Sequence, residues 1–374
     1  MKIRPFLVEE WMNRYETGAR YNIAETCVDS VSLDELIELC RVDRGRFLDE
    51  LTGRRLTYGD IEGAPEFKKG VCGLYRTITP EEIVTTHGAS GANHHVFYSL
   101  IEPGDKVISI SPTYQQLYSI PESFGARVEI LQLRKENGYI LDYERLKEMA
   151  TPDTKLICLN NPNNPTGALM SREFLEQVIN VARSVDAWIL CDEVYRHLSQ
   201  KDEWCESIAD LYEKGISTSG MSKVFSLAGI RCGWIATHDS NLVRSMLSHR
   251  DYDLVSGGMI DEKIAGLALS AREEMLERNR SIVRENLAIV DRWIRSDPHF
   301  SYVRPSAGTT ALIYYDFDMP SVEFCERMYH ETGAFVTPGA CFDLEGCFRL
   351  GYACEKDVLI KGLEAVSEFA KALE

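Results

Sequence analysis

The sequence contains no run of apolar residues close to the roughly 20 that a helix needs to cross a bilayer. Its first residues also lack an apolar signal core, because Met1–Pro5 leads into the acidic pair Glu9 and Glu10. These two absences predict a cytoplasmic protein with no membrane partner.

Basic residues are scarce relative to acidic ones. The chain has 41 Lys and Arg against 58 Asp and Glu, which gives a formal net charge of −17. Because such a charge repels nucleic acid and anionic lipid, we expect no nucleic-acid partner. Small metabolites are the expected partners.

The cysteines lack the spacing of a disulfide framework or a zinc site. There are eleven, an odd number, and no two of them form a C-x-x-C pair. The pattern therefore predicts no metal centre, and the thiols are expected to be reduced, buried small hydrophobes.

What the sequence does contain is an alternation typical of an α/β fold. With 374 residues, of which 44% are hydrophobic, the chain is long enough for two packed domains. Apolar runs separated by helical or turn segments predict a mostly parallel sheet covered by helices on both faces. These runs are Ile83–Thr86, Lys106–Ile110, Arg127–Leu133, Lys155–Leu159 and Ala187–Cys191. An amphipathic helix is expected over residues 6–16, and one long helix from about Asp261 to Arg295.

Lys223 is the most informative single residue. It lies among small and hydroxyl residues, has no charged neighbour in sequence until Arg231, and no other lysine has a comparable apolar context. An amine held in a crowded apolar pocket loses proton affinity, and the neutral amine can form a Schiff base with an aldehyde. The alternative is a buried lysine paired with a distant acid.

Three further stretches place polar groups beside predicted strands. The small residues of His87–Asn93 open a helix after a strand, where backbone N–H groups and the Ser90 hydroxyl can hold an anion. Asp192 ends an apolar strand, where a carboxylate is costly without a partner. Arg349, flanked by apolar residues, needs an anionic partner, and its planar fork suits a carboxylate.

Ser222-Lys223 followed by Gly229-Ile230-Arg231-Cys232-Gly233-Trp234 resembles the S-K-x(5)-G-x-R-x-G-[WY] signature of fold-type I, pyridoxal-phosphate-dependent aminotransferases of class I and II. The resemblance covers about residues 56–355 through six ordered motifs. It implies a large cofactor-binding domain over residues 41–275 and a small α+β domain formed by residues 1–40 and 276–374. It also implies that Lys223 carries the cofactor as an internal aldimine.

The same resemblance implies roles for the other motif residues. Phosphate would be held by Arg231, Ala89, Ser90, Gly91 and Ser222. Tyr114 would stack on the pyridine ring, Asn164 and Tyr195 would bond its 3-oxygen, and Asp192 would pair with its protonated nitrogen. Arg349 would bind the substrate α-carboxylate. Tyr58 would reach the cofactor phosphate of a neighbouring subunit, which implies a homodimer.

Two local departures from the family pattern concern the site. Gly220 stands where most relatives carry a phosphate-binding serine or threonine, and Ser219 and Ser222 are the candidates to replace it. Ala24–Cys27 replaces a glycine that often contacts the substrate carboxylate. Glu25 in this stretch either faces a cationic substrate group or is a solvated glutamate, and the second interpretation is favoured.

The resemblance implies an aminotransferase that moves an amino group between an amino acid and a 2-oxo acid, with Lys223, Asp192 and Tyr195 as catalytic residues. The alternative is a lyase or cyclase, because the segment Trp11–Tyr15 and the polar stretch after it are weakly similar to capreomycidine synthase-like members. Glu193 is expected to be structural, since neighbouring strand residues point to opposite faces.

Overall fold

The computed structural model describes residues 2–201 and 204–374. Its largest element is a seven-stranded sheet with the order β2-β8-β7-β6-β5-β3-β4. Neighbouring strands are parallel except around β8, which is antiparallel to both β2 and β7. The strands are β2 (Ile83–His87), β3 (Lys106–Ser111), β4 (Arg127–Gln132), β5 (Thr154–Asn160), β6 (Trp188–Asp192), β7 (Gly215–Gly220) and β8 (Cys232–Ala236).

Helices cover both faces of this sheet, because successive strand residues point to opposite sides and both sides are apolar. Val107 packs with Val96 and Met246 on one face, whereas Ile108 packs with Leu146 and Val178 on the other. The helices on the first face are α5 (Gly88–Leu100), α6 (Gln116–Ser123) and α10 (Ser240–Arg250), and those on the second are α7 (Tyr143–Met149) and α8 (Arg172–Ser184). The predicted α/β class and its strands are therefore confirmed.

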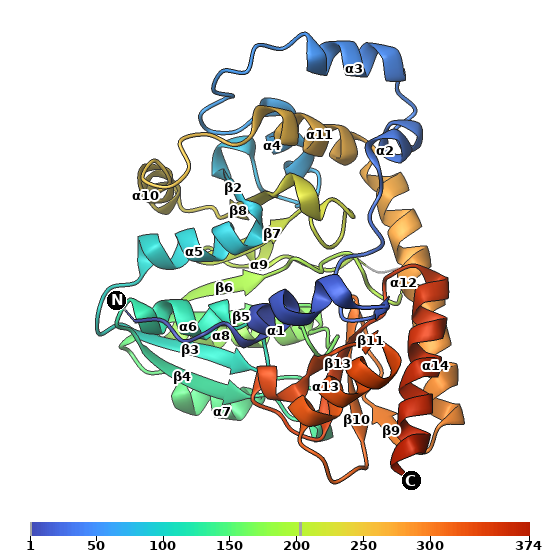
Figure 1. Cartoon of the computed structure of the whole chain (residues 1–374). Coiled ribbons are helices and arrows are strands. Elements are labelled where there is room, and N and C mark those ends of the chain that lie inside the picture. The colour runs from blue at the N-terminus through green and yellow to red at the C-terminus, as the bar shows by residue number, and fades with distance from the viewer. Residues whose placement is uncertain (1, 202–203) are drawn as a thin grey trace.

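A second group of elements comes from the C-terminal part of the chain and the N-terminus (Figure 1). A four-stranded antiparallel sheet has the order β12-β13-β10-β9, and a two-residue strand near the N-terminus pairs with β11. The strands are β1 (Tyr21–Asn22), β9 (Phe300–Tyr302), β10 (Thr310–Tyr315), β11 (Ala334–Phe335), β12 (Thr337–Pro338) and β13 (Cys347–Gly351). Their helices are α1 (Leu7–Tyr15), α12 (Arg272–Ser296), α13 (Ser321–Thr332) and α14 (Lys356–Leu373).

The remaining helices lie at the opposite end of the molecule or link the strands (Figure 1). They are α2 (Leu33–Leu39), α3 (Arg44–Thr52), α4 (Pro65–Cys72), α9 (Ile208–Leu211) and α11 (Met259–Ser270), with short 3-10 turns at Glu16–Gly18, Pro80–Glu82, Lys135–Asn137, Ala228–Ile230 and Gly339–Phe342. Across residues 2–201 and 204–374, every helix is too short or too polar to span a membrane.

One predicted element is wrong. The expected single helix from about Asp261 to Arg295 is two helices, α11 and α12, which meet at Ala271. Ala271 has φ −113° and ψ 36°, outside the helical region, so the chain changes direction there. The turn lets α11 pack on α4 while α12 runs beside α14 (Figure 1). The helix expected over residues 6–16 is confirmed as α1.

The N-terminal helix joins the two groups of elements. In Figure 1, α1 lies in front of the large sheet and beside the C-terminal elements. The indole N–H of Trp11 donates to the carbonyl of Val336 at 2.8 Å, and the Phe6 ring lies 4.8 Å from the ring of Tyr114. The N-terminal segment therefore covers the carboxyl ends of the central strands.

Candidate active site

A pocket of about 480 Å³ lies where β5 and β6 end, at the first turn of α5. This is the edge at which parallel α/β sheets commonly place ligands. Its wall combines residues from the sheet, from the N-terminal segment and from β13. The polar and charged side chains that line it are Glu9, Asn13, Glu16, Glu25, Thr26, Ser90, Asn93, Tyr114, Gln116, Asn160, Asn164, Asp192, Tyr195, Ser222, Lys223, Arg231 and Arg349.

Asp192 ends β6 at the floor of the pocket and is 3% exposed. The side-chain amide of Asn93 donates to Oδ2 at 2.9 Å, and the backbone N–H of Val194 donates to Oδ1 at 3.1 Å. Burial raises the pKa of the Asp192 carboxyl, and these two donors partly offset that rise. A carboxylate in this position favours a positively charged partner on its open side.

Lys223 reaches the pocket from the loop after β7. Its Nζ donates to Oγ1 of Thr26 at 2.6 Å and to Sγ of Cys27 at 3.4 Å, and lies 3.8 Å from Oε1 of Glu25. Burial alone lowers the pKa of an ammonium, but the acidic groups around it raise the pKa of Lys223 above its ordinary value. Glu25 is the nearby group ionised at neutral pH, because burial raises the pKa of the Cys27 thiol to about 11.

One expectation about Lys223 is therefore wrong. Its pKa is raised, because Cys27 and Glu25 of the N-terminal segment and Tyr195 lie around it. Two other lysines are more buried than Lys223, whose side chain is 25% exposed: Lys68 is 8% exposed and Lys106 is 6% exposed. Lys106 is held by the Met149 carbonyl at 2.7 Å and by Glu129 at 3.2 Å. Of these three lysines, Lys223 is the one that lines the pocket.

Glu25 is partly exposed but is held in the pocket wall by hydrogen bonds and by an ion pair with Lys223. Its Oε1 accepts the backbone N–H groups of Thr26 at 2.7 Å and Cys27 at 2.9 Å. Burial opposes ionisation, but Lys223 and the backbone donors outweigh it and lower the pKa of Glu25 to about 2. Glu25 is thus a fixed negative charge in the pocket wall.

The first turn of α5 and Arg231 form a cradle of hydrogen-bond donors. No described side chain caps α5, so the N–H groups of Gly88–Gly91 are available to an anion. Arg231 lies against this turn: a Cβ at Gly88, whose φ is +70°, would be 2.7 Å from its Nη2. Glycine at 88 is therefore what allows the guanidinium this close to the helix N-terminus.

The cradle also explains the departure at Gly220. A Cβ at this position would lie 3.1 Å from the backbone nitrogen of Ala89 and 3.0 Å from the carbonyl oxygen of Cys232. Of the two candidates to replace its hydroxyl, Ser219 donates to the Glu193 carbonyl at 3.5 Å, whereas Ser222 lines the pocket 3.5 Å from Nη1 of Arg231. Ser222 is the better placed hydroxyl.

Arg349 lies on β13 and is 2% exposed. Its Nη2 donates to the Ala24 carbonyl at 3.2 Å and to Thr337 at 3.1 Å, and Nη1 donates to Oδ1 of Asn164 at 3.3 Å. Its Nε has no hydrogen-bond partner among the described residues. Burial lowers the pKa of the Arg349 guanidinium, which favours an additional anionic partner.

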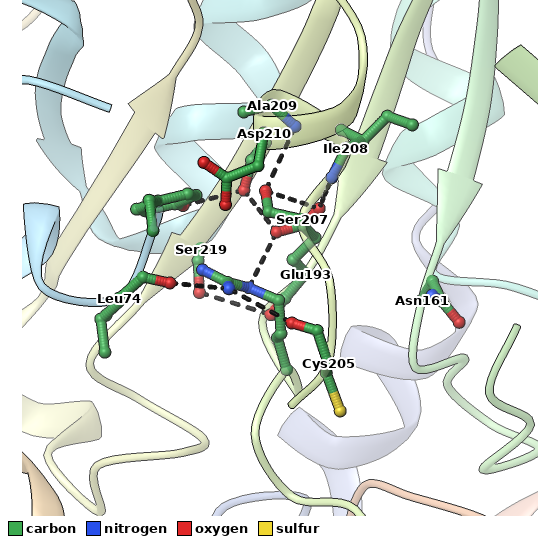
Figure 2. A network of polar contacts seen from close by, with 12 residues as sticks. Leu74, Asn161, Glu193, Cys205, Ser207, Ile208, Ala209, Asp210 and Ser219 are labelled. Atoms are coloured by element: carbon green, nitrogen blue, oxygen red, sulfur yellow. Dashed lines mark hydrogen bonds and ion pairs between the residues drawn. The ribbon is translucent and has the colours of Figure 1, made fainter. Parts of the chain in front are cut away.

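Glu193, next to Asp192, faces away from the pocket as expected. Its carboxylate pairs with Nε of Arg196 at 3.0 Å and accepts Ser217 Oγ at 2.7 Å. Figure 2 shows this buried network, in which Ser207 and the backbone N–H of Ile208 also reach Glu193, at 3.1 Å and 2.7 Å. Apart from Nε of Arg196, which makes the ion pair but no hydrogen bond, these groups are hydrogen-bonded, so the network supports β6 and β7 on the side away from the pocket.

The sequence model of the family described as aminotransferase class I and II matches residues 39–366. The chain belongs to this family. A PLP-dependent aminotransferase of known structure from Streptococcus suis 89-1591 is 46% identical, with a TM-score of 0.97 over 100% of this chain and 99% of that chain.

Two relatives of the class I and II aminotransferase family have lower identity. Capreomycidine synthase of Streptomyces vinaceus is 27% identical over 363 residues, 96% of this chain and 92% of that protein. The aspartate/prephenate aminotransferase of Thermus thermophilus is 29% identical over 332 residues, 84% of this chain and 83% of that protein. The cofactor of the family is pyridoxal phosphate, and the expectation of this cofactor is confirmed.

The residues that line the pocket fit pyridoxal phosphate chemically. The uncapped turn of α5, with Arg231 and Ser222 beside it, suits a phosphate. Asp192, buried and open on one side, suits a protonated pyridine nitrogen. Lys223 lines the same pocket and offers an amine.

The pocket brings together most residues that the sequence analysis assigned to the site. Ala89, Ser90, Tyr114, Asn164, Asp192, Tyr195, Ser222, Lys223, Arg231 and Arg349 all line it. Gly91 belongs to the first turn of α5 but is not part of the pocket lining. Tyr58 is 72% exposed and lies in a separate surface hollow with Gly59 and Met259, so this chain alone does not bring it to the pocket.

Sequence reasoning missed several polar residues in the pocket. Asn93 lies one turn into α5 on its buried side, and its position inside the small-residue turn was a usable signal. Thr26 and Asn160 also contribute, Asn160 by accepting the backbone N–H of Asn164 at 2.7 Å. Glu9 and Glu16 enter from α1 and the turn after it. Nothing in their spacing connects them with Lys223.

Proposed function

We propose that the protein is a pyridoxal-phosphate-dependent transaminase that moves the amino group of an amino acid to a 2-oxo acid in the pocket around Lys223. The observation that carries the proposal is the shared lining of this one pocket: Lys223, the buried carboxylate of Asp192 and the buried guanidinium of Arg349 all border it. An amino acid offers an amine and a carboxylate, which match a reacting lysine and an arginine fork.

When bound, pyridoxal phosphate supplies an electron sink for the Cα–H bond of an amino acid. The protein's own residues bind the substrate, hold charge and move the proton. Arg349 fixes the substrate carboxylate, and Asp192 holds positive charge at the floor of the pocket. Lys223, in its neutral form, takes the Cα proton on Nζ and holds it there for return. Thr26 keeps Nζ at that position through its 2.6 Å hydrogen bond.

We further propose the assembly and domain division that the family implies. The protein acts as a homodimer in which Tyr58 of one subunit reaches the site of the other. The large domain comprises residues 41–275, and residues 1–40 and 276–374 form the small domain. The exposure of Tyr58 supports this arrangement, because a tyrosine 72% exposed in one chain is available to a second.

The transaminase proposal is tested by following nitrogen. The holoenzyme is incubated with a ¹⁵N-labelled amino acid and an unlabelled 2-oxo acid. The ¹⁵N content of each product is then measured by mass spectrometry. Transamination delivers the label to the amino acid formed from the acceptor, with one donor-derived 2-oxo acid per transfer. Labelled ammonium without label in the acceptor would instead indicate elimination.

A second candidate is a cyclase or lyase that acts on an amino acid. It is favoured by the match to capreomycidine synthase, which covers 96% of this chain and so extends beyond the part matched by the family model. A cyclase keeps the substrate's α-nitrogen and expels a group from its side chain, whereas a β-eliminating lyase releases that nitrogen as ammonium. A product that retains the label and forms without any 2-oxo acid acceptor would favour this candidate.

A further inference from the structure

Three glutamates of the N-terminal segment line the pocket that holds Lys223 and Arg349. Glu9 lies on α1, Glu16 begins the turn after α1, and Glu25 lies in the irregular stretch that follows β1. Each is partly buried. This part of the pocket wall is therefore strongly acidic.

The described residues neutralise little of this charge. Oε1 of Glu9 accepts the Tyr114 hydroxyl at 2.8 Å, and Oε1 of Glu16 accepts the Asn22 side-chain amide at 3.3 Å. Within residues 2–201 and 204–374, neither Glu9 nor Glu16 forms an ion pair. Burial, followed by the negative charge of Glu25, raises the pKa of Glu16. The carboxylates are thus close enough to repel one another.

The charges of the holoenzyme leave these glutamates without a partner. The described cations that line the pocket are Lys223, Arg231 and Arg349. In the proposed function Lys223 and Arg231 bind the cofactor, and Arg349 pairs with the substrate carboxylate. Asp192 is likewise matched by the pyridine nitrogen. Partly buried carboxylates without a cation are costly, so the missing positive charge is expected to come with the substrate.

The buried guanidinium of Arg349 is an independent indication of a ligand. Arg349 is 2% exposed and borders the pocket, yet among the described residues it forms no ion pair and its Nε has no hydrogen-bond partner. A carboxylate bound there and an amine at Lys223 fix two of the substituents on the substrate's Cα. The side chain is then left to the remaining polar wall, which the N-terminal segment supplies.

We propose that the substrate is an amino acid whose side chain ends in a guanidinium or ammonium group, and that Glu9 and Glu16 bind this cation, with Glu25 adding to the negative field. The inference rests on the proposed function because it concerns the same pocket. A neutral side chain leaves the carboxylates uncompensated, and an acidic one is repelled by them.

The first test compares amino donors. Steady-state kcat/KM is measured for L-arginine, L-lysine, L-norleucine and L-glutamate with one common acceptor. At least one cationic donor is expected to exceed norleucine by about tenfold or more, the effect of one charge-assisted hydrogen bond. The double variant Glu9→Gln with Glu16→Gln should lower the ratio of kcat/KM for the cationic donor to kcat/KM for norleucine about tenfold.

A matched control is available on the same helix. Glu10 is adjacent to Glu9 but exposed and absent from the pocket lining, so Glu10→Gln removes one charge without touching the pocket. This variant should retain the wild-type ratio of kcat/KM for the cationic donor to kcat/KM for norleucine. Equal kcat/KM for all four donors, a preference for glutamate, or an unchanged ratio in the double variant would each overturn the proposal.

The second test does not require turnover. Binding of 5-guanidinopentanoate and of hexanoate to the holoenzyme is measured by titration calorimetry, since both carry a carboxylate and neither carries an amine. Tighter binding of the guanidino acid, lost in the double variant and kept in Glu10→Gln, supports the cation site even if transamination is absent. Equal binding of the two acids refutes the cation site even if transamination occurs.

Discussion

Nζ of Lys223 donates a 2.6 Å hydrogen bond to Oγ1 of Thr26, a residue 197 positions earlier in the chain. The same stretch brings Glu25 to 3.8 Å from Nζ and the Ala24 carbonyl to 3.2 Å from Arg349. The N-terminal segment is thus part of the pocket wall, in contact with both Lys223 and Arg349.

The first prediction concerns Lys223. Lys223→Ala should abolish turnover and also covalent attachment of pyridoxal phosphate, measured as the mass added to the protein after borohydride reduction. Lys68→Ala is the matched control, because Lys68 is 8% exposed but does not line the pocket, and this variant should gain the cofactor mass. A stoichiometric mass increase localised to the same peptide in Lys223→Ala would contradict the assignment.

A second prediction follows from the pKa of Glu25, which is lowered to about 2 from an ordinary value of 4.5. A carboxylate whose pKa is lower in the folded state stabilises the protein above the unfolded pKa, and loses that contribution as pH falls toward the folded pKa. In the apoprotein, wild type should therefore be more stable than Glu25→Gln near pH 7. The difference should shrink between about pH 4.5 and 2.

The full shift would correspond to about 3 kcal/mol, but the Glu25 side chain is 38% exposed, so solvent screening leaves an expected difference of about 1–2 kcal/mol. Urea unfolding of both proteins from pH 7 down to pH 3 measures it. A difference in the free energy of unfolding that is constant or grows over this range would show that Lys223 does not stabilise the Glu25 carboxylate.

Much of the fold and half of the pocket could be predicted from the sequence, because their signals are local. The strands of the large sheet are short apolar runs, and Asp192, Asn164 and Lys223 belong to contiguous motifs. The break at Ala271 could not be predicted, because the sequence on both sides is helical and only packing against α4 and α14 decides where the chain turns.

The other half of the pocket depends on contacts between distant segments. Thr26 and Lys223 meet because β1 pairs with β11 and because the chain after β1 crosses Gly351, where a Cβ would lie 1.9 Å from the Glu25 carbonyl oxygen. No sequence spacing predicts that the chain after β1 passes this close to Gly351. For the same reason the uncharged sequence neighbours of Lys223 predict a lowered pKa, whereas in the structure Glu25 lies 3.8 Å from its Nζ.

A third prediction concerns Asp192 and Asn93. Asp192→Asn should keep the cofactor bound but slow Cα-proton exchange of an amino acid by about a hundredfold or more, the scale of losing one preorganised electrostatic contact. Asn93→Ala removes the 2.9 Å donor to Asp192 and should slow exchange about tenfold, because a hydrogen bond to a charged group contributes about 1.5–3 kcal/mol.

Because Asn93 is expected to act through Asp192, the two losses should not add in the double variant. Proton exchange is followed by NMR in deuterated buffer, so that product release does not enter the rate. Additive losses would mean that Asn93 serves the site independently, for example through the Thr218 hydroxyl that donates to it at 2.6 Å.

The homodimer gives a fourth prediction. Tyr58→Ala and Lys223→Ala subunits are purified separately, each with low activity, and then mixed under conditions that exchange subunits. A hybrid dimer contains one site with an intact Lys223 and a Tyr58 supplied by the other chain, so each hybrid should have half of the wild-type activity. Because random exchange of equal amounts makes half of the dimers hybrids, the mixture should rise toward about a quarter of the wild-type value. No recovery, although exchange is verified by mass spectrometry, would place Tyr58 outside the neighbouring site.

The last prediction concerns how the substrate is held. Arg349→Lys keeps a positive charge but removes the planar fork, so it should lower kcat/KM for amino acids while sparing that for simple amines without a carboxylate. The loss expected for amino acids is roughly ten- to a hundredfold, since a charge-assisted hydrogen bond contributes about 1.5–3 kcal/mol. Thermal unfolding of the variant controls for the contacts that Arg349 makes with Asn164, Thr337 and Ala24. If amines and amino acids lose rate equally, Arg349 supports the fold instead, and the carboxylate must be bound by the stretch of residues 22–31 that lies against it.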